Sequence, residues 1–173
     1  MEKIWLAEYK KTGIPESVAL PAENTSLVDI FERNFQKYGS RDAFIFMDKV
    51  LTFNELEVAS RKFATYLQSL NLAKGTRVAV MMPNVFQYPV VALGIFRAGL
   101  VLVNVNPLYT ARELDHQLND SGAEVLVIIE NFASVYQTIV GKTPVKHVVV
   151  ATVGDMLGTL KGTLVNFVLR KVR

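Results

Sequence analysis

The stretch AGLVLVNVNPLYTARELDHQL, residues Ala98–Leu118, contains the pattern that decides the fold. Its first part, Leu100–Val105, is almost wholly apolar, as is usual for a strand that is buried on both faces. This strand ends in an Asn-x-Asn-Pro turn, and the residues from Thr110 onward have the spacing of an amphipathic helix. The stretch therefore predicts one strand–turn–helix unit of a parallel sheet covered by helices.

The same unit recurs along most of the chain, with short connections between its parts. We predict further strands at 42–48, 77–82, 124–129 and 147–151. We predict helices at 26–38, 53–70, 85–98, 110–120 and 131–140. Strands and helices that alternate from about Ala43 to Ala151 indicate the α/β class. The expected architecture is an open, mostly parallel, doubly wound sheet with helices on both faces and right-handed crossovers.

Capping residues mark the ends of several helices. Thr52 and Glu55 have the spacing of a capping box, which predicts that a helix begins after Thr52. Gly39 and Gly122 are expected to stop the helices that precede them. Pro89 is expected either in the first turn of its helix or at a kink within it.

The two ends of the chain differ from this central part. Residues 1–25 are expected to form an extended lead that packs on the domain, and residues 26–153 to form an α/β subdomain. Residues 154–173 form an amphipathic, basic tail with apolar residues at helical intervals, namely Leu157, Leu160, Leu164, Val168 and Val172. Two interpretations of this tail stay open: a helix that lies on an anionic membrane, or a helix that packs on further protein.

Two features of the sequence are also found in membrane proteins. Val78–Phe96 carries no charge and is long enough to span a bilayer, but Pro83 and Pro89 lie near its middle. We therefore interpret this segment as a strand, a turn and a helix. Small residues at Gly154, Gly158 and Gly162 have the spacing of membrane helix pairs. Charged residues interrupt them, so we interpret that spacing as a coincidence.

Composition limits the classes of protein to which the chain can belong. Of its 173 residues 50% are hydrophobic, which is typical of a packed domain. The chain has no cysteine and only two histidines, which excludes disulfides and cysteine nucleophiles and leaves little for a zinc site. A net charge of +3 is too mild to indicate nucleic-acid binding. The first residues do not have the pattern of a secretory signal.

The best candidate site lies where the predicted strands end, because ligands bind beyond the carboxyl ends of strands in open α/β sheets. The segments Met82–Asn84 and Asn104–Thr110 occupy such positions. The second segment and the helix after it offer amides, hydroxyls and a guanidinium for phosphate, from Asn104, Asn106, Pro107, Tyr109, Thr110 and Arg112. The alternative is that these residues only shape the turn and cap the helix.

Other motifs of site chemistry are absent from the sequence. The segment VGKTP at 140–144 resembles the end of a phosphate-binding loop, but Tyr136 stands where the first glycine is required. No G-x-G-x-x-G dinucleotide fingerprint occurs. Neither His116 nor His147 has sequence neighbours that indicate a hydrolase triad. We therefore assign no catalytic residue and no metal ligand in this chain.

Several stretches together resemble the amino-terminal region of adenylate-forming enzymes. They are LTFNEL at 51–56, KGTRVAVMMPN at 74–84, the run at 94–127 that contains NPLYTARELDHQLNDSGA, and GDMLGTLKGTLVNFV at 154–168. The first three are patterns of the whole superfamily. The NPLYTARELDHQLNDSGA run and the tail are most similar to bacterial long-chain fatty-acid CoA ligases.

The resemblance implies a two-step reaction carried out by a longer protein. A fatty-acid carboxylate attacks the α-phosphate of ATP, with Mg²⁺ as the metal, to give an acyl adenylate; CoA then displaces AMP. It also implies a cytoplasmic protein, and relatives use this region in dimer contacts. A homodimer and peripheral contact of the tail with the inner face of the membrane stay open as alternatives, and the mild net charge indicates no nucleic-acid partner. Long-chain fatty acid, ATP and CoA are the implied substrates of the parent protein.

The family's main catalytic groups have no counterpart in residues 1–173. These are the Gly/Ser/Thr-rich phosphate loop, the glutamate that holds magnesium, the aspartate on the ribose and the catalytic lysine of the carboxy-terminal domain. We expect them beyond Arg173, so the chain alone is expected to be inactive and to bind no cofactor tightly. In some relatives an arginine that contacts CoA follows the Asn-Pro pair; here that residue is Leu108. Thr76 replaces a usual aspartate at a turn, without consequence for activity.

Two alternatives from other classes remain. The chain could be a structural module that pairs with a second copy, because an incomplete sheet leaves apolar surface. It could also be an independent small-molecule-binding domain of the doubly wound type.

Overall fold

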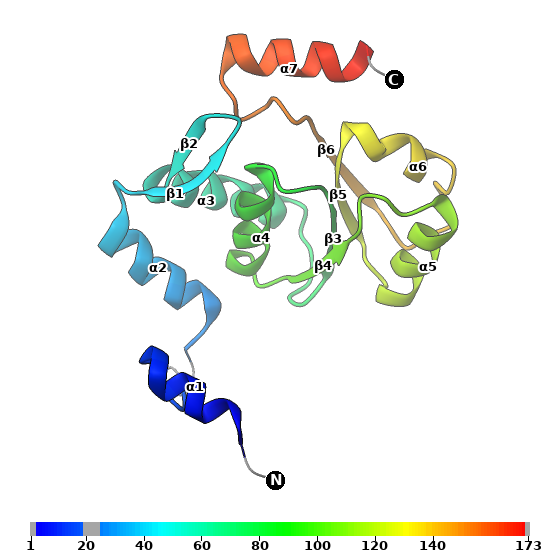
Figure 1. Cartoon of the computed structure of the whole chain (residues 1–173). Coiled ribbons are helices and arrows are strands. Elements are labelled where there is room, and N and C mark those ends of the chain that lie inside the picture. The colour runs from blue at the N-terminus through cyan, green and yellow to red at the C-terminus, as the bar shows by residue number, and fades with distance from the viewer. Residues whose placement is uncertain (1–2, 19–24, 172–173) are drawn as a thin grey trace.

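A parallel sheet of four strands forms the centre of the molecule in the computed structural model, which describes residues 3–18 and 25–171. The strands are β3 (Arg77–Met81), β4 (Val101–Val105), β5 (Val125–Ile129) and β6 (His147–Ala151), and their order across the sheet is β4-β3-β5-β6. Each strand was expected close to its observed position. Figure 1 shows the sheet between two groups of helices.

Helices cover both faces of this sheet, as the double winding requires. One face carries α3 (Phe53–Ser69) and α4 (Gln87–Arg97), and the other carries α5 (Ala111–Ser121) and α6 (Ala133–Gln137). Alternate residues of β5 divide between these two cores: Val125, Val127 and Ile129 join the first, and Leu126 and Ile128 join the second. The expected α/β class and doubly wound architecture are confirmed.

Helix caps follow the sequence pattern closely. Thr52 and Glu55 form the expected capping box at the start of α3. Ser26 caps α2 (Leu27–Tyr38) in the same way with Asp29. Gly122 ends α5 with a left-handed backbone, at φ +62°, which glycine adopts without steric cost.

The uncharged segment Val78–Phe96 folds as the sequence predicted, into β3, a turn and most of α4. Pro89 lies in the first turn of α4, where its missing N–H breaks no helical hydrogen bond. Helix α4 packs closely on α3, since a β-carbon at Gly94 would lie 2.7 Å from a ring carbon of Phe63. Within the described ranges, no helix has both the length and the apolar character needed to cross a bilayer.

The first predicted strand does not join the parallel sheet, and here the expectation was wrong. Residues Asp42–Phe46 form β1, which pairs antiparallel with an unexpected strand, β2 (Lys49–Thr52). The tight turn between them places Met47 and Asp48 at positive φ, +48° and +58°. Such turns usually contain Asn-Gly or Asp-Gly, so Met-Asp gave no signal for a hairpin.

The amino-terminal lead is not extended as expected. Trp5–Thr12 forms helix α1, which ends at Gly13 with φ +69°. None of its residues is buried, and Figure 1 shows α1 apart from the sheet. An isolated helix of this length is marginal in water; an ion pair of 2.7 Å between Lys11 and Glu8, and a hydrogen bond from the N–H of Gly13 to the backbone oxygen of Tyr9, are the local contacts that support it. Residues 19–24 of the lead lie outside the described residues.

The carboxy-terminal half contains two further differences of detail. In place of a helix over 131–140, a 3₁₀ turn (Glu130–Phe132) leads into the short α6. The tail forms helix α7 (Thr159–Lys171), while Leu157 is buried just before it. Val172 and Arg173, which the tail pattern included, lie outside the described residues.

Candidate functional site

The loops after all four parallel strands meet at one edge of the sheet. The chain leaves β3 for β4 on one side and then returns to β5 on the other side. In doubly wound sheets ligands bind where the strand order reverses in this way, which here is between the carboxyl ends of β3 and β5. The predicted site segment Asn104–Arg112 begins in the last two residues of β4, the outer strand, so it lies beside this reversal point.

Asn104 is the expected site residue with the clearest link to a neighbouring element. Its side-chain oxygen accepts a hydrogen bond of 2.9 Å from the hydroxyl of Tyr88, in the first turn of α4. Its backbone oxygen accepts a bond of 2.8 Å from the amide of Gln117 on α5. Asn104 therefore joins α4 and α5 across the end of β4.

Asn106 and Thr110 make the contacts of a turn and a helix cap. The side-chain oxygen of Asn106 accepts from the backbone N–H of Leu108 at 3.0 Å. Thr110 forms a capping box with Glu113, and these hydrogen bonds, from the Thr110 hydroxyl and backbone, hold the pKa of Glu113 below its ordinary value. The sequence left open whether these residues bind a ligand or only shape the turn. Their contacts favour the second interpretation, in which Asn106 shapes the turn and Thr110 caps the helix.

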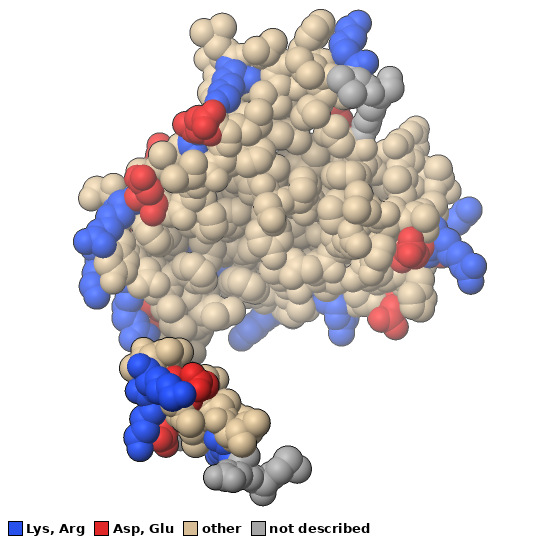
Figure 2. Space-filling model, in the orientation of Figure 1, with Lys and Arg blue, Asp and Glu red and all other residues tan. Residues whose placement is uncertain are grey.

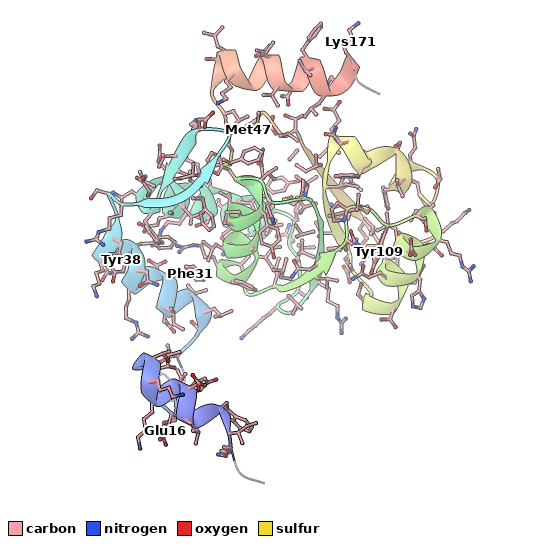
Figure 3. All side chains as sticks on the ribbon, in the orientation of Figure 1. Glu16, Phe31, Tyr38, Met47, Tyr109 and Lys171 are labelled. Atoms are coloured by element: carbon pink, nitrogen blue, oxygen red, sulfur yellow. The ribbon has the colours of Figure 1, made fainter. Side chains whose placement is uncertain are left out.

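The remaining expected residues lie on either side of this turn. Pro107 is half-buried within it, and Tyr109 lies between the sheet and α5, against the core (Figure 3). Arg112 is exposed on the first turn of α5 and lines a shallow hollow with Thr110, Glu113 and His116. Arg112 is thus placed where an anion could approach, but apart from the hydrogen bond between Asn104 and Tyr88.

An apolar hollow that the sequence reasoning missed lies next to Tyr88. Its volume is about 320 Å³, and its walls come from β1, from the loop after β3 and from the first turn of α4. Its lining includes Phe44, Phe46, Asn84, Phe86 and Tyr88. Asn84 belongs to the Met82–Asn84 turn, which the sequence indicates as a candidate site. The aromatic side chains from β1 belong to the hairpin, which the sequence did not indicate.

Helix α7 lies over the carboxyl ends of β5 and β6 (Figure 1). Arg170 forms a two-oxygen ion pair with Glu130, directly after β5, at 2.9 Å. This carboxylate raises the pKa of the Arg170 guanidinium above its ordinary value. Asn166 donates to the hydroxyl of Thr152 and accepts from the N–H of Gly154, both at 2.8 Å. The tail thus covers the β5–β6 side of this edge.

Two of the three tail glycines, Gly154 and Gly162, have a structural role that is not the packing of a membrane helix pair. Gly154 lies in the loop after β6, and Gly162 is the only residue of α7 that is buried among those described. A β-carbon on either glycine would overlap the backbone oxygen of the other. Two glycines are therefore needed for α7 to approach the loop, within one protein chain and not between membrane helices.

The titratable side chains of the described residues do not gather into a metal centre. No three or more His, Asp or Glu side chains in 3–18 and 25–171 are close enough to hold one ion. The edge of the sheet offers an amide–hydroxyl pair, an apolar hollow and an exposed guanidinium. These groups can bind and orient a ligand.

Comparisons with known proteins identify what the chain resembles. The profile of the family described as AMP-binding enzyme matches residues 31–171. The long-chain-fatty-acid–CoA ligase of Escherichia coli O157:H7 is 52% identical over 174 aligned residues, which cover the whole of this chain. The chain spans only 31% of the length of that relative.

Solved structures agree with this comparison. A long-chain-fatty-acid-CoA ligase from Archaeoglobus fulgidus superposes with a TM-score of 0.72 and 26% identity, over 88% of this chain and 31% of that one. An anthranilate CoA ligase in complex with anthranoyl-AMP superposes with a TM-score of 0.71 and 25% identity, over 76% of this chain and 27% of that one.

Proposed function

The chain belongs to the family of AMP-binding enzymes, and from that premise we propose that it is the amino-terminal part of a long-chain fatty-acid CoA ligase. The observation that carries this proposal is the 52% identity to the E. coli ligase across the full length of the chain. The shared fold with CoA ligases supports it.

The proposed parent reaction has two steps. A carboxylate oxygen of the fatty acid attacks the α-phosphorus of ATP, the bond to pyrophosphate breaks, and an acyl adenylate forms. The sulfur of CoA then attacks the acyl carbon, AMP leaves, and a thioester remains. Because both steps bring anions together, the enzyme must hold them in place and offset their charge.

The residues at the edge of this sheet do not fit the nucleotide or its metal. The side-chain oxygen of Asn106 is bonded to a turn N–H, and the hydroxyl of Thr110 to Glu113. Mg²⁺ prefers several oxygen ligands, and the described residues provide no carboxylate cluster. We therefore assign no catalytic step to the side chains of this chain, and we propose that residues 1–173 alone are inactive.

We assign this part of the ligase a scaffolding role with two binding surfaces. The apolar hollow of about 320 Å³ beside Tyr88 suits part of an acyl chain, because its walls are mainly aromatic and aliphatic. Arg112, at the amino end of α5, suits a phosphate of CoA. Location in the cytoplasm, a homodimer and peripheral contact with the membrane complete the proposal; light scattering of the purified chain tests the dimer.

A chimaera tests the proposed function. The matching segment of the E. coli ligase is replaced by residues 1–173 of this chain, and formation of acyl-CoA from a long-chain fatty acid, ATP and CoA is measured. We expect turnover within about tenfold of the unmodified ligase, because a scaffold with this identity should preserve the geometry of the site. A folded chimaera without turnover would contradict the proposal, whereas an unfolded one is recognised by circular dichroism and replaced by a shorter exchange over residues 31–171.

A further inference from the structure

Helix α7 carries large apolar side chains on its outward face, in addition to Val165, which packs on the core of the domain. In a soluble protein the apolar face of a helix packs on the core, and the polar face meets water. On α7 three large apolar side chains face outward: Leu160 is 89% exposed, Leu164 62% and Phe167 58%. These three residues lie at i, i+4 and i+7, so they form one continuous face along the helix.

The opposite side of α7 is held to the domain by Val165, which packs on the core, by a glycine and by polar contacts. Gly162 packs on Gly154, Asn166 bonds to the loop after β6, and Arg170 pairs with Glu130. These three residues also follow one another at intervals of four. The helix is therefore fixed with its apolar face directed away from the sheet, and rotating it to bury that face would break all three contacts.

The charged residues of α7 indicate which kind of partner binds its outward face. Helix α7 contains no acidic residue, and its basic residues lie toward its two ends. Lys171 continues the outward face, four residues after Phe167, and its ammonium lies 5.7 Å from that ring. Near the start of the helix, Lys161 bonds to the backbone oxygen of Met47 and lies 3.8 Å from Asp48.

Figure 2 shows a largely uncharged surface along α7, with Lys or Arg side chains at both ends and acidic side chains beside those at one end. Figure 3 places Lys171 at the carboxyl end of the helix, pointing outward. Lys161 and Arg170 have acidic partners in Asp48 and Glu130, whereas Lys171 lies on the outward face itself. An apolar stripe without a carboxylate that ends in a lysine matches the interface of an anionic bilayer, where acyl chains lie beneath the headgroups.

We propose that the outward face of α7, formed by Leu160, Leu164, Phe167 and Lys171, is a lipid-binding surface that lies in the interface of an anionic membrane. The inference deepens the proposed membrane contact by naming the residues that make it. A ligase of long-chain fatty acids handles a substrate that partitions into bilayers, so this surface would keep the enzyme where its substrate is concentrated.

Binding to vesicles tests the proposal without ATP, CoA or enzyme activity, so its failure is separate from failure of the proposed function. The full chain, and the chimaeric ligase that adds the remaining part of the protein, are each mixed with vesicles of phosphatidylcholine alone, or with about a quarter phosphatidylglycerol, and the bound fraction is measured by flotation. Binding by the chain alone and not by the folded chimaera would overturn the proposal, since the remaining protein would then be what covers α7. We expect binding to the anionic vesicles, weak binding to neutral ones, and release at high salt.

A single tryptophan reports where α7 lies. The chain has one tryptophan, Trp5, so the double substitution Trp5→Phe and Phe167→Trp moves the only indole onto the outward face. We expect a blue shift of its emission and quenching by brominated acyl chains when anionic vesicles are added. An emission spectrum that vesicles leave unchanged would overturn the proposal.

Substitutions separate this surface from other exposed apolar residues. Leu160→Glu with Leu164→Glu should lower the vesicle-bound to free ratio about tenfold or more, because both leucines would enter the interface. Val58→Glu is the matched control: Val58 is 53% exposed, on α3, and binding should stay at the wild-type level. Equal binding by all variants would overturn the proposal. So would self-association that the leucine substitutions abolish in a chain that binds no vesicles, since the occupant would then be a second copy.

Discussion

Gly154 and Gly162 lie so close together that a β-carbon on either residue would overlap the carbonyl oxygen of the other. This contact joins the loop after β6 to helix α7. No side chain intervenes, so the approach depends on both residues being glycine.

The substitution Gly162→Ala tests the role of this contact in stability. The added methyl group must push α7 away from the loop, and overpacking of this kind costs about 1–3 kcal/mol. We expect a lower urea midpoint and faster amide exchange over residues 159–171. Thr163→Ala, at the next and exposed position, should change the free energy of unfolding by less than about 0.5 kcal/mol. Equal effects of the two substitutions would contradict the assigned contact.

A second prediction concerns the ion pair between Arg97 and Glu32, which joins α4 to α2. The side chain of Arg97 is only 8% exposed and also donates to the hydroxyl of Ser60. Glu32→Gln leaves this guanidinium buried without its negative partner, which should cost about 2 kcal/mol or more. Chemical denaturation followed by circular dichroism measures the loss.

The control for this ion pair is Glu57→Gln. Glu57 pairs with Arg61, whose side chain is 55% exposed, so water replaces the lost interaction. The expected cost is about 0–1 kcal/mol. If both variants lost the same stability, burial of Arg97 would not be the cause.

A third prediction follows from the capping boxes at the starts of α2, α3 and α5. Hydrogen bonds from Ser26, Thr52 and Thr110 lower the pKa values of their carboxylates, Asp29, Glu55 and Glu113. A lowered pKa in the folded state stabilises the protein above the unfolded values, 3.8 for Asp29 and 4.5 for the glutamates, and this contribution is lost as the pH falls through the folded values.

Urea midpoints between pH 7 and pH 3 measure this effect. The wild-type chain should lose stability more steeply below about pH 4.5 than the variant with Asp29→Asn, Glu55→Gln and Glu113→Gln. A second triple variant, with Glu16→Gln, Asp42→Asn and Asp120→Asn, removes three exposed carboxylates that cap no helix. It should keep the wild-type slope, and a flattened slope in this control would show that general charge repulsion is responsible.

A fourth prediction concerns Arg112 in the chimaeric ligase. If its guanidinium contacts a phosphate of CoA, Arg112→Gln should raise the KM for CoA about five- to tenfold. Fatty-acid-dependent exchange of pyrophosphate, which needs no CoA, should not change. Lys142 is an exposed lysine whose backbone oxygen accepts a hydrogen bond from Asn119, at the other end of α5. Lys142→Gln should leave both the KM for CoA and the rate of pyrophosphate exchange unchanged. An unaltered KM in the Arg112 variant would remove that residue from the site.

The parallel sheet could be predicted from the sequence because its signal is local. All five residues of β5 are buried, and the wholly apolar run VLVII predicts this burial. Capping boxes such as Thr52 with Glu55 are likewise complete within four residues. The hairpin was missed because Met47 and Asp48 adopt positive φ in its turn, a conformation that Asn-Gly or Asp-Gly would have indicated and Met-Asp does not.

The site was only partly predictable, because its contacts are not local. The turn at Asn104 was found from its position after a strand. Its partner Tyr88 is 16 residues away in sequence, and only the crossover from β3 to β4 brings the two together. The direction of the apolar face of α7 was also beyond the sequence, since periodicity shows that a helix has two faces but not which one points outward.

The measurement that tests the central claim most directly is fatty-acid-dependent exchange of labelled pyrophosphate into ATP, with the chain alone and with the chimaera. The account predicts exchange by the chimaera and none by residues 1–173, because this part holds the scaffold and the remaining part of the ligase holds the nucleotide site. Exchange by the chain alone would contradict the account, and would require the turn from Asn104 to Arg112 to be catalytic.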